Sequence, residues 1–280
     1  MVTRFAPSPT GPLHLGHAYS ALTIQTLGAD GRVHLRIEDV DRTRSRAHHA
    51  AQIEDDLHWI GFRWDGAIRV QSEHRAEHEA ALASLSARGL TYPCSCSRRE
   101  IGDAGARIGA MGLVYPGTCR GRSMEDARPG DAIRLDIGRA LAVAGDLPGF
   151  TEWGPLHSGK HAVEPAYLTR DIGDPVLIRR ESGDIAYDLA CPHDDAALGV
   201  NHVIRGADLW PNTPLHVLIQ TLMDWPVPDY FHHELVTDQT GRRLAKVDRS
   251  KAIARYRDEG MSPKDLRAML PPLPAIPWAP

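Results

Sequence analysis

The chain has 280 residues, of which 42% are hydrophobic and 24% are charged, and its formal net charge at pH 7 is −4. An apolar fraction this high with so little net charge excludes general disorder, and no apolar run is long enough to span a bilayer. The near-neutral balance also argues against a protein that coats nucleic acid indiscriminately, while leaving room for a local basic patch. With no signal-peptide pattern at the N-terminus and only four cysteines, we expect a cytoplasmic protein with no membrane association.

The first part of the chain alternates strands, Gly/Pro loops and helices, which is typical of a parallel α/β sheet. The hydrophobic spacing predicts strands at 2–6 and 32–38 and helices at 18–27, 47–60 and 73–87.

The stretch 93–122 interrupts this alternation with cysteines, glycines and arginines, and we interpret it as a small inserted module. Beyond it, the pattern predicts strands at 131–137, 175–179, 185–189 and 203–206 and a helix at 213–223, while the Gly/Pro-punctuated stretch 145–165 is not assigned to any element. For the last fifty residues we expect short helical pieces before a proline-rich end that cannot be a regular helix.

A phosphate-binding motif is indicated where the first predicted strand ends and the first helix begins. Such a loop presents backbone N–H groups and the positive end of the helix dipole. His14 and His17, separated by Leu-Gly, can donate hydrogen bonds to phosphate oxygens as charge builds in a transition state, and Gly16 lets a flat base or sugar approach the backbone. The alternative is a proline-rich surface loop that holds two of the chain's 15 histidines.

Three cysteines gather in the inserted module, at Cys94, Cys96 and Cys119. Thiolates about 2.3 Å from the metal are typical ligands of tetrahedral zinc. Because no histidine lies between Tyr92 and Arg122, the fourth ligand stays open on the residues alone. The alternative is a set of reduced free cysteines in a loop.

Four blocks of the sequence resemble, in order, those of class I aminoacyl-tRNA synthetases of the glutamyl branch. They are Arg4–His17, Arg36–Arg44, Val203–Leu209 and Arg243–Val247, and together they cover most of the chain. The resemblance implies an α/β fold with a Rossmann-type nucleotide-binding parallel sheet, an inserted small zinc-binding module and a short helical C-terminal part.

The resemblance also implies roles for individual residues. Arginine supplies the bidentate clamp that a carboxylate side chain needs, so we assign Arg205, with Arg4, to the side-chain carboxylate of glutamate. Glu38 is the expected acceptor for the substrate ammonium group, and Tyr187 is expected to line the substrate. Taken alone, Glu38 would be a solvated strand end and Tyr187 a core aromatic residue. The expected glutamate-binding set is Arg4, Ala6, Ser8, Glu38, Tyr187 and Arg205.

The expected ATP-binding set is Pro9, His14, Gly16, His17, Arg243, Leu244 and Lys246, with His14, His17 and Lys246 as the catalytic residues. Only four of the 32 basic residues are lysines, which makes Lys246 informative. An ammonium group near the phosphates stabilises charge on departing pyrophosphate. The fourth block departs from the family's Lys-Met-Ser-Lys-Ser wording at Arg243, Ala245 and Val247, so the charge pattern is kept while a hydroxyl contact is lost.

In the resembling family Tyr115 matches the fourth zinc ligand, which gives Cys94, Cys96, Tyr115 and Cys119 as the expected set for a structural Zn²⁺. Mg²⁺ is expected to accompany ATP. One departure concerns Asp188, which stands where relatives often carry asparagine.

An ordinary glutamyl-tRNA synthetase continues into helical anticodon-binding domains, whereas this chain ends soon after the Lys246 block. We therefore divide it into 1–92, the first half of the catalytic domain; 93–122, the zinc-binding insertion; 123–225, a connective region and the second half; and 226–280, a short helical region with the ATP-signature loop and no anticodon-binding domain.

This organisation resembles the glutamyl-queuosine tRNA(Asp) synthetases. It implies a monomer that activates L-glutamate with ATP without tRNA and transfers it to queuosine in the anticodon loop of tRNA(Asp). The alternatives are a truncated glutamyl-tRNA synthetase that charges tRNA(Glu), an adenylate-forming ligase that glutamylates a small molecule or a carrier protein, and a non-catalytic RNA-binding relic.

Overall fold

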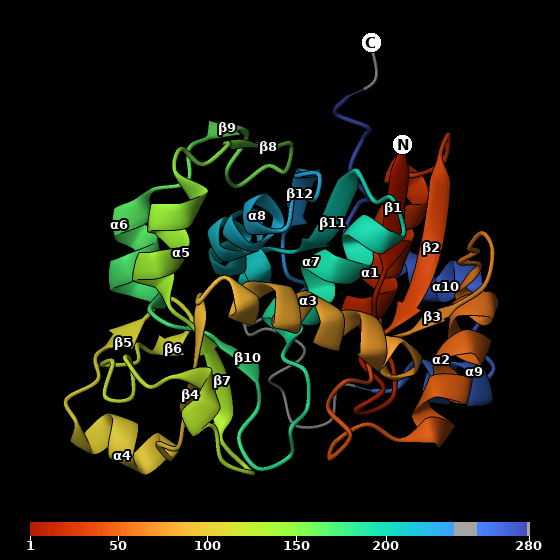
Figure 1. The fold of residues 1–280 in the computed structure, drawn as a ribbon. Helices are drawn as coiled ribbons and strands as arrows, with labels where there is room; N and C mark the ends of the chain where they lie inside the picture. Colours follow the sequence, from red (N-terminus) through yellow and green to blue (C-terminus); the bar gives the residue numbers. More distant parts are fainter. Residues whose placement is uncertain (238–250, 279–280) are drawn as a thin grey trace.

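The structure is a computed structural model that describes residues 1–237 and 251–278 (Figure 1). The strands are β1 (Val2–Phe5), β2 (Arg32–Ile37), β3 (Arg69–Val70), β4 (Thr91–Cys94), β5 (Ile108–Gly109), β6 (Gly112–Leu113), β7 (Ala132–Leu135), β8 (Phe150–Glu152), β9 (Gly159–His161), β10 (Val176–Ile178), β11 (His202–Gly206) and β12 (Asp229–His233).

The α-helices are α1 (Leu15–Leu27), α2 (Ala47–Ile60), α3 (Arg75–Ala87), α4 (Arg98–Asp103), α5 (Ile137–Ala144), α6 (Pro165–Tyr167), α7 (Tyr187–Ala197), α8 (Thr213–Leu222), α9 (Ile253–Asp258) and α10 (Pro263–Ala268). Short 3-10 helices cover Gln71–His74, Met124–Asp126 and Ala207–Asn212, and a short π-helix covers Leu168–Ile172.

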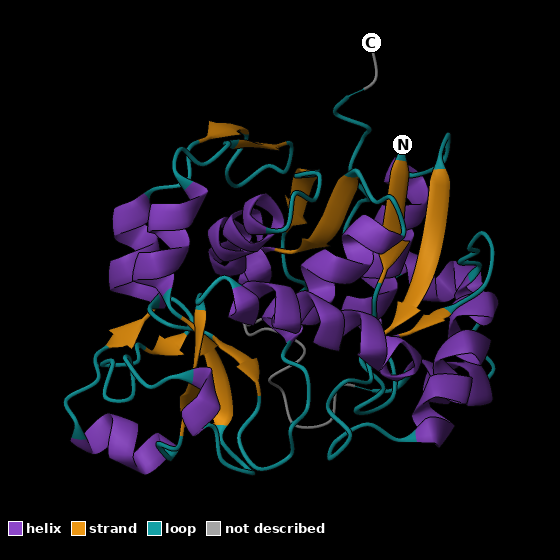
Figure 2. Ribbon diagram, viewed as in Figure 1, coloured by secondary structure: helices purple, strands orange, loops and turns teal. Residues whose placement is uncertain are grey.

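Two sheets form the centre of the molecule. In the first, β1, β2 and β3 are parallel; in the second, β11, β12 and β8 are parallel and β9 closes the edge in the antiparallel sense. The sheets meet at β1 and β11, where the Asn201 N–H donates to the Val2 carbonyl at 3.0 Å. Figure 2 shows β2, β1, β11 and β12 side by side with helices packed around them, which confirms the expected α/β class.

A third sheet carries the inserted part of the chain. Strands β10, β7 and β4 are antiparallel, and the hairpin β5–β6 lies beside them. The expected boundary at residue 92 lies inside β4, whose last residue is Cys94. A small core of its own, which includes Tyr92, Cys94 and Tyr115, supports this part.

Most expected elements are present, but two expectations were wrong. Residues 185–189 are not a strand, because only Ile185 forms a bridge, to Ile178, and Tyr187 begins helix α7. The last fifty residues are not only helical pieces, because β12 pairs with both β11 and β8. In both places the apolar residues are buried on more than one side, so their spacing does not distinguish helix from strand.

The sheets and helices enclose two large apolar cores. One surrounds α7 and α8, with Leu189, Leu215 and Leu218 fully buried; the other lies between the first sheet and α1 and α2, with Leu35 and Leu57 fully buried.

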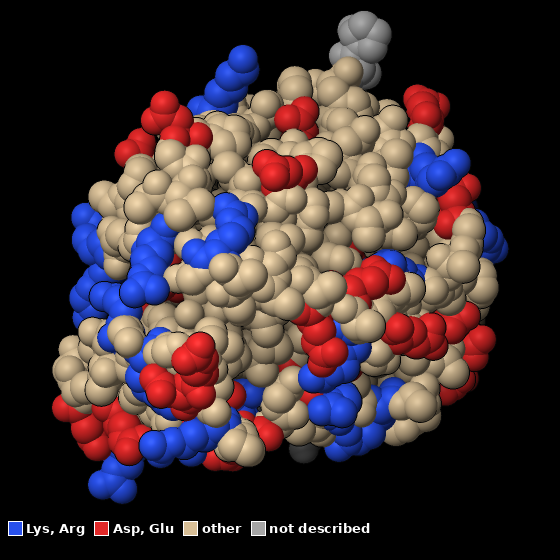
Figure 3. All heavy atoms as spheres, in the orientation of Figure 1, with Lys and Arg blue, Asp and Glu red and all other residues tan. Residues whose placement is uncertain are grey.

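Basic and acidic side chains are interspersed over the face of the molecule shown in Figure 3. In the described part of the chain, no helix has both the length and the apolar character needed to cross a membrane.

Candidate active site

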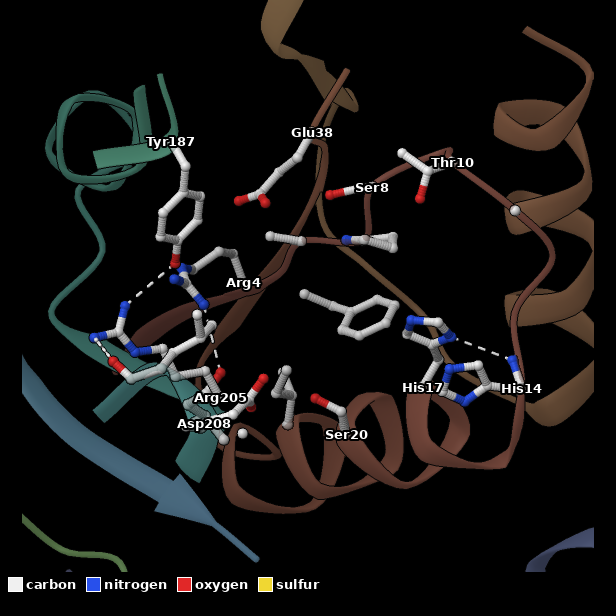
Figure 4. Close-up of a pocket in the computed structure, with 18 of the residues that line it drawn as sticks. Arg4, Ser8, Thr10, His14, His17, Ser20, Glu38, Tyr187, Arg205 and Asp208 are labelled. Atoms are coloured by element: carbon white, nitrogen blue, oxygen red, sulfur yellow. Dashed lines mark hydrogen bonds between the residues drawn. The ribbon is translucent and has the colours of Figure 1, made fainter. Parts of the chain in front are cut away.

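A cavity of about 570 Å³ opens where β1 and β11 end and α1 begins (Figure 4). The ends of parallel strands at which the chain turns into loops and helices are where α/β proteins bind their ligands. The structure brings together eight of the expected residues along its wall: Arg4, Ala6, Ser8, His14, His17, Glu38, Tyr187 and Arg205. Pro9 and Gly16 belong to the same loop and helix start without lining the cavity, and Arg243, Leu244 and Lys246 lie outside the described residues.

The two histidines stand at the N-terminus of α1, at one end of the cavity (Figure 4). The His14 ring accepts a hydrogen bond from the Gly16 N–H at 3.1 Å, and the His17 ring accepts one from the His14 N–H at 3.2 Å. Both acceptors are Nδ1, so each neutral ring carries its proton on Nε2. The geometry therefore gives each imidazole an Nε2–H donor at a helix N-terminus, where anions bind readily.

Gly16 also has a structural role, beside the expected one in ATP binding. A methyl group at its Cα would lie 3.0 Å from His14 Cε1, because the His14 ring folds back over this residue. Glycine leaves the space that the His14 ring occupies.

Buried ion pairs form the opposite end of the cavity. Asp195, on α7, accepts hydrogen bonds from Arg4 Nε at 2.7 Å and from Arg36 at 2.5 Å, and Arg36 also donates to Glu38 at 2.9 Å. Burial opposes ionisation of Asp195, but the two guanidinium groups lower its pKa to about 2. Burial raises the pKa of Glu38, against the opposing effect of Arg36. The charge of Arg4 is therefore already balanced inside the protein.

Arg205 is buried differently, with only 5% of the residue exposed. Its five polar contacts are all to neutral groups: the rings of His232 (3.0 Å) and His216 (3.4 Å), the hydroxyls of Tyr187 (3.3 Å) and Thr213 (2.9 Å), and the carbonyl of Leu209 (3.2 Å). Over the residues that the structure describes, no carboxylate forms an ion pair with it. A buried cation without a counter-ion is costly unless a bound anion completes the site.

Asp188 does not face the cavity, although it follows Tyr187 directly. Its Oδ1 accepts hydrogen bonds from Asn212 Nδ2 at 2.8 Å and from His216 Nε2 at 3.2 Å. An acidic residue at this position is therefore compatible with an anionic substrate, because polar neighbours hold it away from the cavity.

Several functional residues were missed by sequence reasoning. Asp195 accepts a hydrogen bond from Arg4, and His232 accepts one from Arg205. They belong to α7 and β12, the elements whose type was predicted wrongly. Ser20 and the exposed Asp208 also line the cavity (Figure 4). Ser20 could have been predicted to line the cavity, because it lies next to His17 on the same face of α1.

The cysteines of the inserted part converge as expected. The Sγ atoms of Cys94, Cys96 and Cys119 all lie within 4.8 Å of one another, and Cys96 Sγ is 3.5 Å from Cys119 Sγ. The Tyr115 hydroxyl lies 3.4 Å from Cys96 Sγ and accepts the Cys119 N–H at 2.8 Å. Tetrahedral ligands about 2.3 Å from zinc are roughly 3.8 Å apart, so this spacing and donor set fit the metal.

A second buried group of possible metal ligands consists of His78, His193 and Asp194, but both carboxylate oxygens of Asp194 already accept hydrogen bonds. Asp194 accepts hydrogen bonds from both histidines and also from Arg69 and Gln71, each at 2.8–3.0 Å. Because a guanidinium group already neutralises the carboxylate, this group is a packing network.

Comparisons with known proteins agree with this geometry. The family of class I tRNA synthetases (E and Q), catalytic domain, matches residues 1–128 and 162–273. The glutamyl-Q tRNA(Asp) synthetase of Rhodobacter capsulatus is 47% identical, with 96% of this chain and 99% of the relative covered. The protein of the same name from Nocardia farcinica is 41% identical, with 95% and 82% covered.

Among solved structures, a glutamate-tRNA synthetase from Elizabethkingia anophelis is 27% identical, with a TM-score of 0.67. It is matched over 86% of this chain and 51% of its own, so the chain spans about half of that synthetase. The methionyl-tRNA synthetase of Mycobacterium tuberculosis, 10% identical with a TM-score of 0.60, shares the fold alone. Because the family match and the curated relatives cover nearly all of its length, the chain belongs to the glutamyl-Q tRNA(Asp) synthetase branch of the class I tRNA synthetases.

Proposed function

We propose that this protein activates L-glutamate with ATP, without requiring tRNA, and transfers the glutamyl group to queuosine in the anticodon loop of tRNA(Asp). The observation that carries the proposal is Arg205, a buried guanidinium at the cavity wall whose contacts are all neutral. A buried guanidinium without a counter-ion is stabilised when the substrate brings a carboxylate, and the glutamate side chain supplies one.

The remaining groups of the cavity fit the rest of the amino acid. Glu38 is the only carboxylate among the expected glutamate-binding residues, and its oxygen atoms face the cavity beside Ser8 and Tyr187 (Figure 4). It is the proposed acceptor for the substrate ammonium. Arg4 is the proposed second member of the carboxylate site; because Asp195 balances its charge, it contributes mainly shape and hydrogen-bonding capacity.

The chemistry needs no protein nucleophile. The α-carboxylate of glutamate attacks the α-phosphorus of ATP, forming glutamyl-adenylate and releasing pyrophosphate. The Nε2–H groups of His14 and His17 stabilise the charge on the phosphates, and Lys246, which lies outside the described residues, is assigned the same task from the sequence. A hydroxyl of the queuosine cyclopentenediol then attacks the adenylate carbonyl and AMP leaves. Positioning and electrostatic stabilisation account for both steps.

Two metal ions belong to this proposal. Mg²⁺ bound with ATP would offset phosphate charge. We infer that Cys94, Cys96, Cys119 and Tyr115 would hold a structural Zn²⁺, because four protein ligands leave no open position. The Arg134 guanidinium lies 3.9 Å from the centre of the Tyr115 ring and holds this ring in place through a cation–π contact.

Transfer of labelled glutamate tests the proposal. The purified protein is incubated with ATP, Mg²⁺ and tRNA(Asp) that carries or lacks queuosine. We expect label on the queuosine-bearing tRNA alone, and we expect it to survive removal of the 3′-terminal adenosine. Label on tRNA(Glu) instead would make the protein a charging enzyme, and adenylate formation with no labelled RNA would identify a small-molecule or protein acceptor.

A further inference from the structure

A line of three buried side chains leads away from the substrate cavity behind Arg205. Arg205 Nε donates to His232 Nε2 at 3.0 Å, and His232 Nδ1 lies 2.6 Å from Glu152 Oε2. Glu152 is 1% exposed and His232 is fully buried. Neither residue lines the cavity, so neither contacts the substrate directly.

The sheet brings these residues together from distant parts of the sequence. Glu152 ends β8 and pairs with Tyr230 of β12, two residues before His232. The His232 ring is held by its neighbours, stacked 5.8 Å from Tyr230 and edge-on to Trp210 at 5.2 Å. The imidazole therefore has little freedom to turn away from Arg205.

Hydrogen bonding decides which nitrogen of His232 carries the proton. Burial opposes ionisation of Glu152, but hydrogen bonds from His232 and from the backbone lower the pKa of this carboxyl, so it is an acceptor. Burial lowers the pKa of His232 to about 4, so its ring is neutral near pH 7. A neutral ring that donates from Nδ1 to Glu152 has a lone pair on Nε2, and that lone pair faces the Arg205 N–H.

The two substrate-facing arginines thus differ in one respect. Arg4 donates directly to the Asp195 carboxylate, whereas an imidazole separates Arg205 from each nearby carboxylate: His232 from Glu152, and the more distant His216 ring from Asp188. We propose that Glu152 and His232 are positioning residues for the glutamate site: Glu152 fixes the His232 tautomer, and His232 orients Arg205 through a neutral acceptor that leaves its charge for the substrate carboxylate. This inference rests on the proposed function, since it assigns glutamate as the anion that Arg205 binds.

The substitution Glu152→Gln tests the inference with almost no change in shape. Oε1 of Glu152 accepts two backbone N–H groups, from His232 at 2.8 Å and from Gly154 at 2.7 Å. The glutamine oxygen has to keep these two bonds, so its NH₂ group takes the other position and points at His232 Nδ1. His232 then has to accept at Nδ1 and carry its proton on Nε2. The Nε2–H of His232 faces the Nε–H of Arg205, and two donors cannot form a hydrogen bond with each other.

Asp174→Asn is the matched control. Asp174 is 2% exposed and likewise uses both oxygens, one for the Ile137 N–H at 3.1 Å and the other for Tyr92 and Arg120. It lies beside the inserted part of the chain, and within the described residues its hydrogen bonds go to Tyr92, Arg120, Arg134 and Ile137, none of which lines the cavity. Both substitutions remove one buried carboxylate charge, so the control shows what the loss of such a charge away from the cavity does to the two KM values.

Glutamate-dependent ATP–pyrophosphate exchange is the assay. For Glu152→Gln we expect the KM for glutamate to rise about tenfold or more, the effect of one misaligned hydrogen bond to a charged group, while the KM for ATP stays the same. For Asp174→Asn we expect neither KM to change. A glutamate KM for Glu152→Gln within about twofold of the parent value would overturn the inference.

The tautomer itself is a second, independent readout. In ¹⁵N–¹H correlation spectra of the imidazole side chains, His232 should be protonated at Nδ1 in the parent protein and at Nε2 in Glu152→Gln. A parent His232 protonated at Nε2 overturns the inference even if the variant does not fold. If the parent protein fails to activate glutamate, the proposed function is wrong, and the tautomer measurement still decides whether Glu152 fixes the His232 tautomer whose Nε2 accepts from Arg205.

Discussion

Replacing Arg205 with methionine removes the cation from the glutamate end of the cavity while keeping an unbranched side chain of similar length. No neighbouring cation can take over, because Arg4 and Arg36 already share Asp195. Leaving one partner of a buried charge pair without the other costs about 3–5 kcal/mol. At about 1.36 kcal/mol for each tenfold change, this predicts a rise in the glutamate KM of roughly two to nearly four orders of magnitude.

The assay is ATP–pyrophosphate exchange at increasing glutamate concentration, repeated with ATP varied. Because His14 and His17 stand at the other end of the cavity, the KM for ATP in Arg205→Met should stay within about twofold of the parent value. Arg4→Met is the comparison: it removes one of the two guanidinium partners of Asp195, so it should also lower the free energy of unfolding, by about 3 kcal/mol. An unchanged glutamate dependence in Arg205→Met would refute the assignment of this residue.

Four further substitutions probe other parts of the structure. Asp56 is buried with neither oxygen hydrogen-bonded in the described chain, and burial raises its pKa to about 6. Because the pKa is higher in the folded state than in the unfolded state, ionisation of Asp56 lowers the stability of the fold. Thermal melts should therefore show that Asp56→Asn raises the free energy of unfolding by about 1–3 kcal/mol at pH 7, and that this gain disappears near pH 4. Gly16→Ala should displace the His14 ring and reduce kcat for exchange about tenfold. Asp188→Asn should raise the glutamate KM less than about threefold, because both donors meet the single oxygen Oδ1, which an amide retains. Cys119→Ser should lose the zinc measured by metal analysis and melt at a lower temperature.

The sequence was sufficient to locate one wall of the cavity. The blocks around Arg4 and His14 are contiguous in the chain, and a loop between a strand and a helix has few ways to arrange its residues. Arg205 and Tyr187 were identified through their place in matching blocks, and the structure brings both to the cavity. Their partners were not identifiable in this way, because Glu152 and His232 meet only when β8 and β12 become neighbours.

Helix α7 illustrates the physical limit of pattern reading. Its first turn begins with Tyr187 and Leu189, whose spacing is that of a strand, and Pro192 inside it is unfavourable for a helix. Tertiary contacts outweigh these local preferences, because α7 packs against α3 and α8 and buries Leu189 completely. The error affected the site more than the fold, since Asp195 is on the part of this helix that a strand ending at 189 leaves out.

The contrast between Arg4 and Arg205 follows from where their partners are placed. Helix α7 carries Asp195 directly to Arg4, while Arg205 meets the rings of His232 and His216, which keep the carboxylates of Glu152 and Asp188 one ring further away. A carboxylate in direct contact with Arg205 would satisfy the cation in the empty enzyme and compete with the substrate for it. Without any carboxylate nearby, the buried cation would have no compensating charge at all. An imidazole between the two charges meets both requirements, which is why the identity of the protonated nitrogen on His232 matters for glutamate binding.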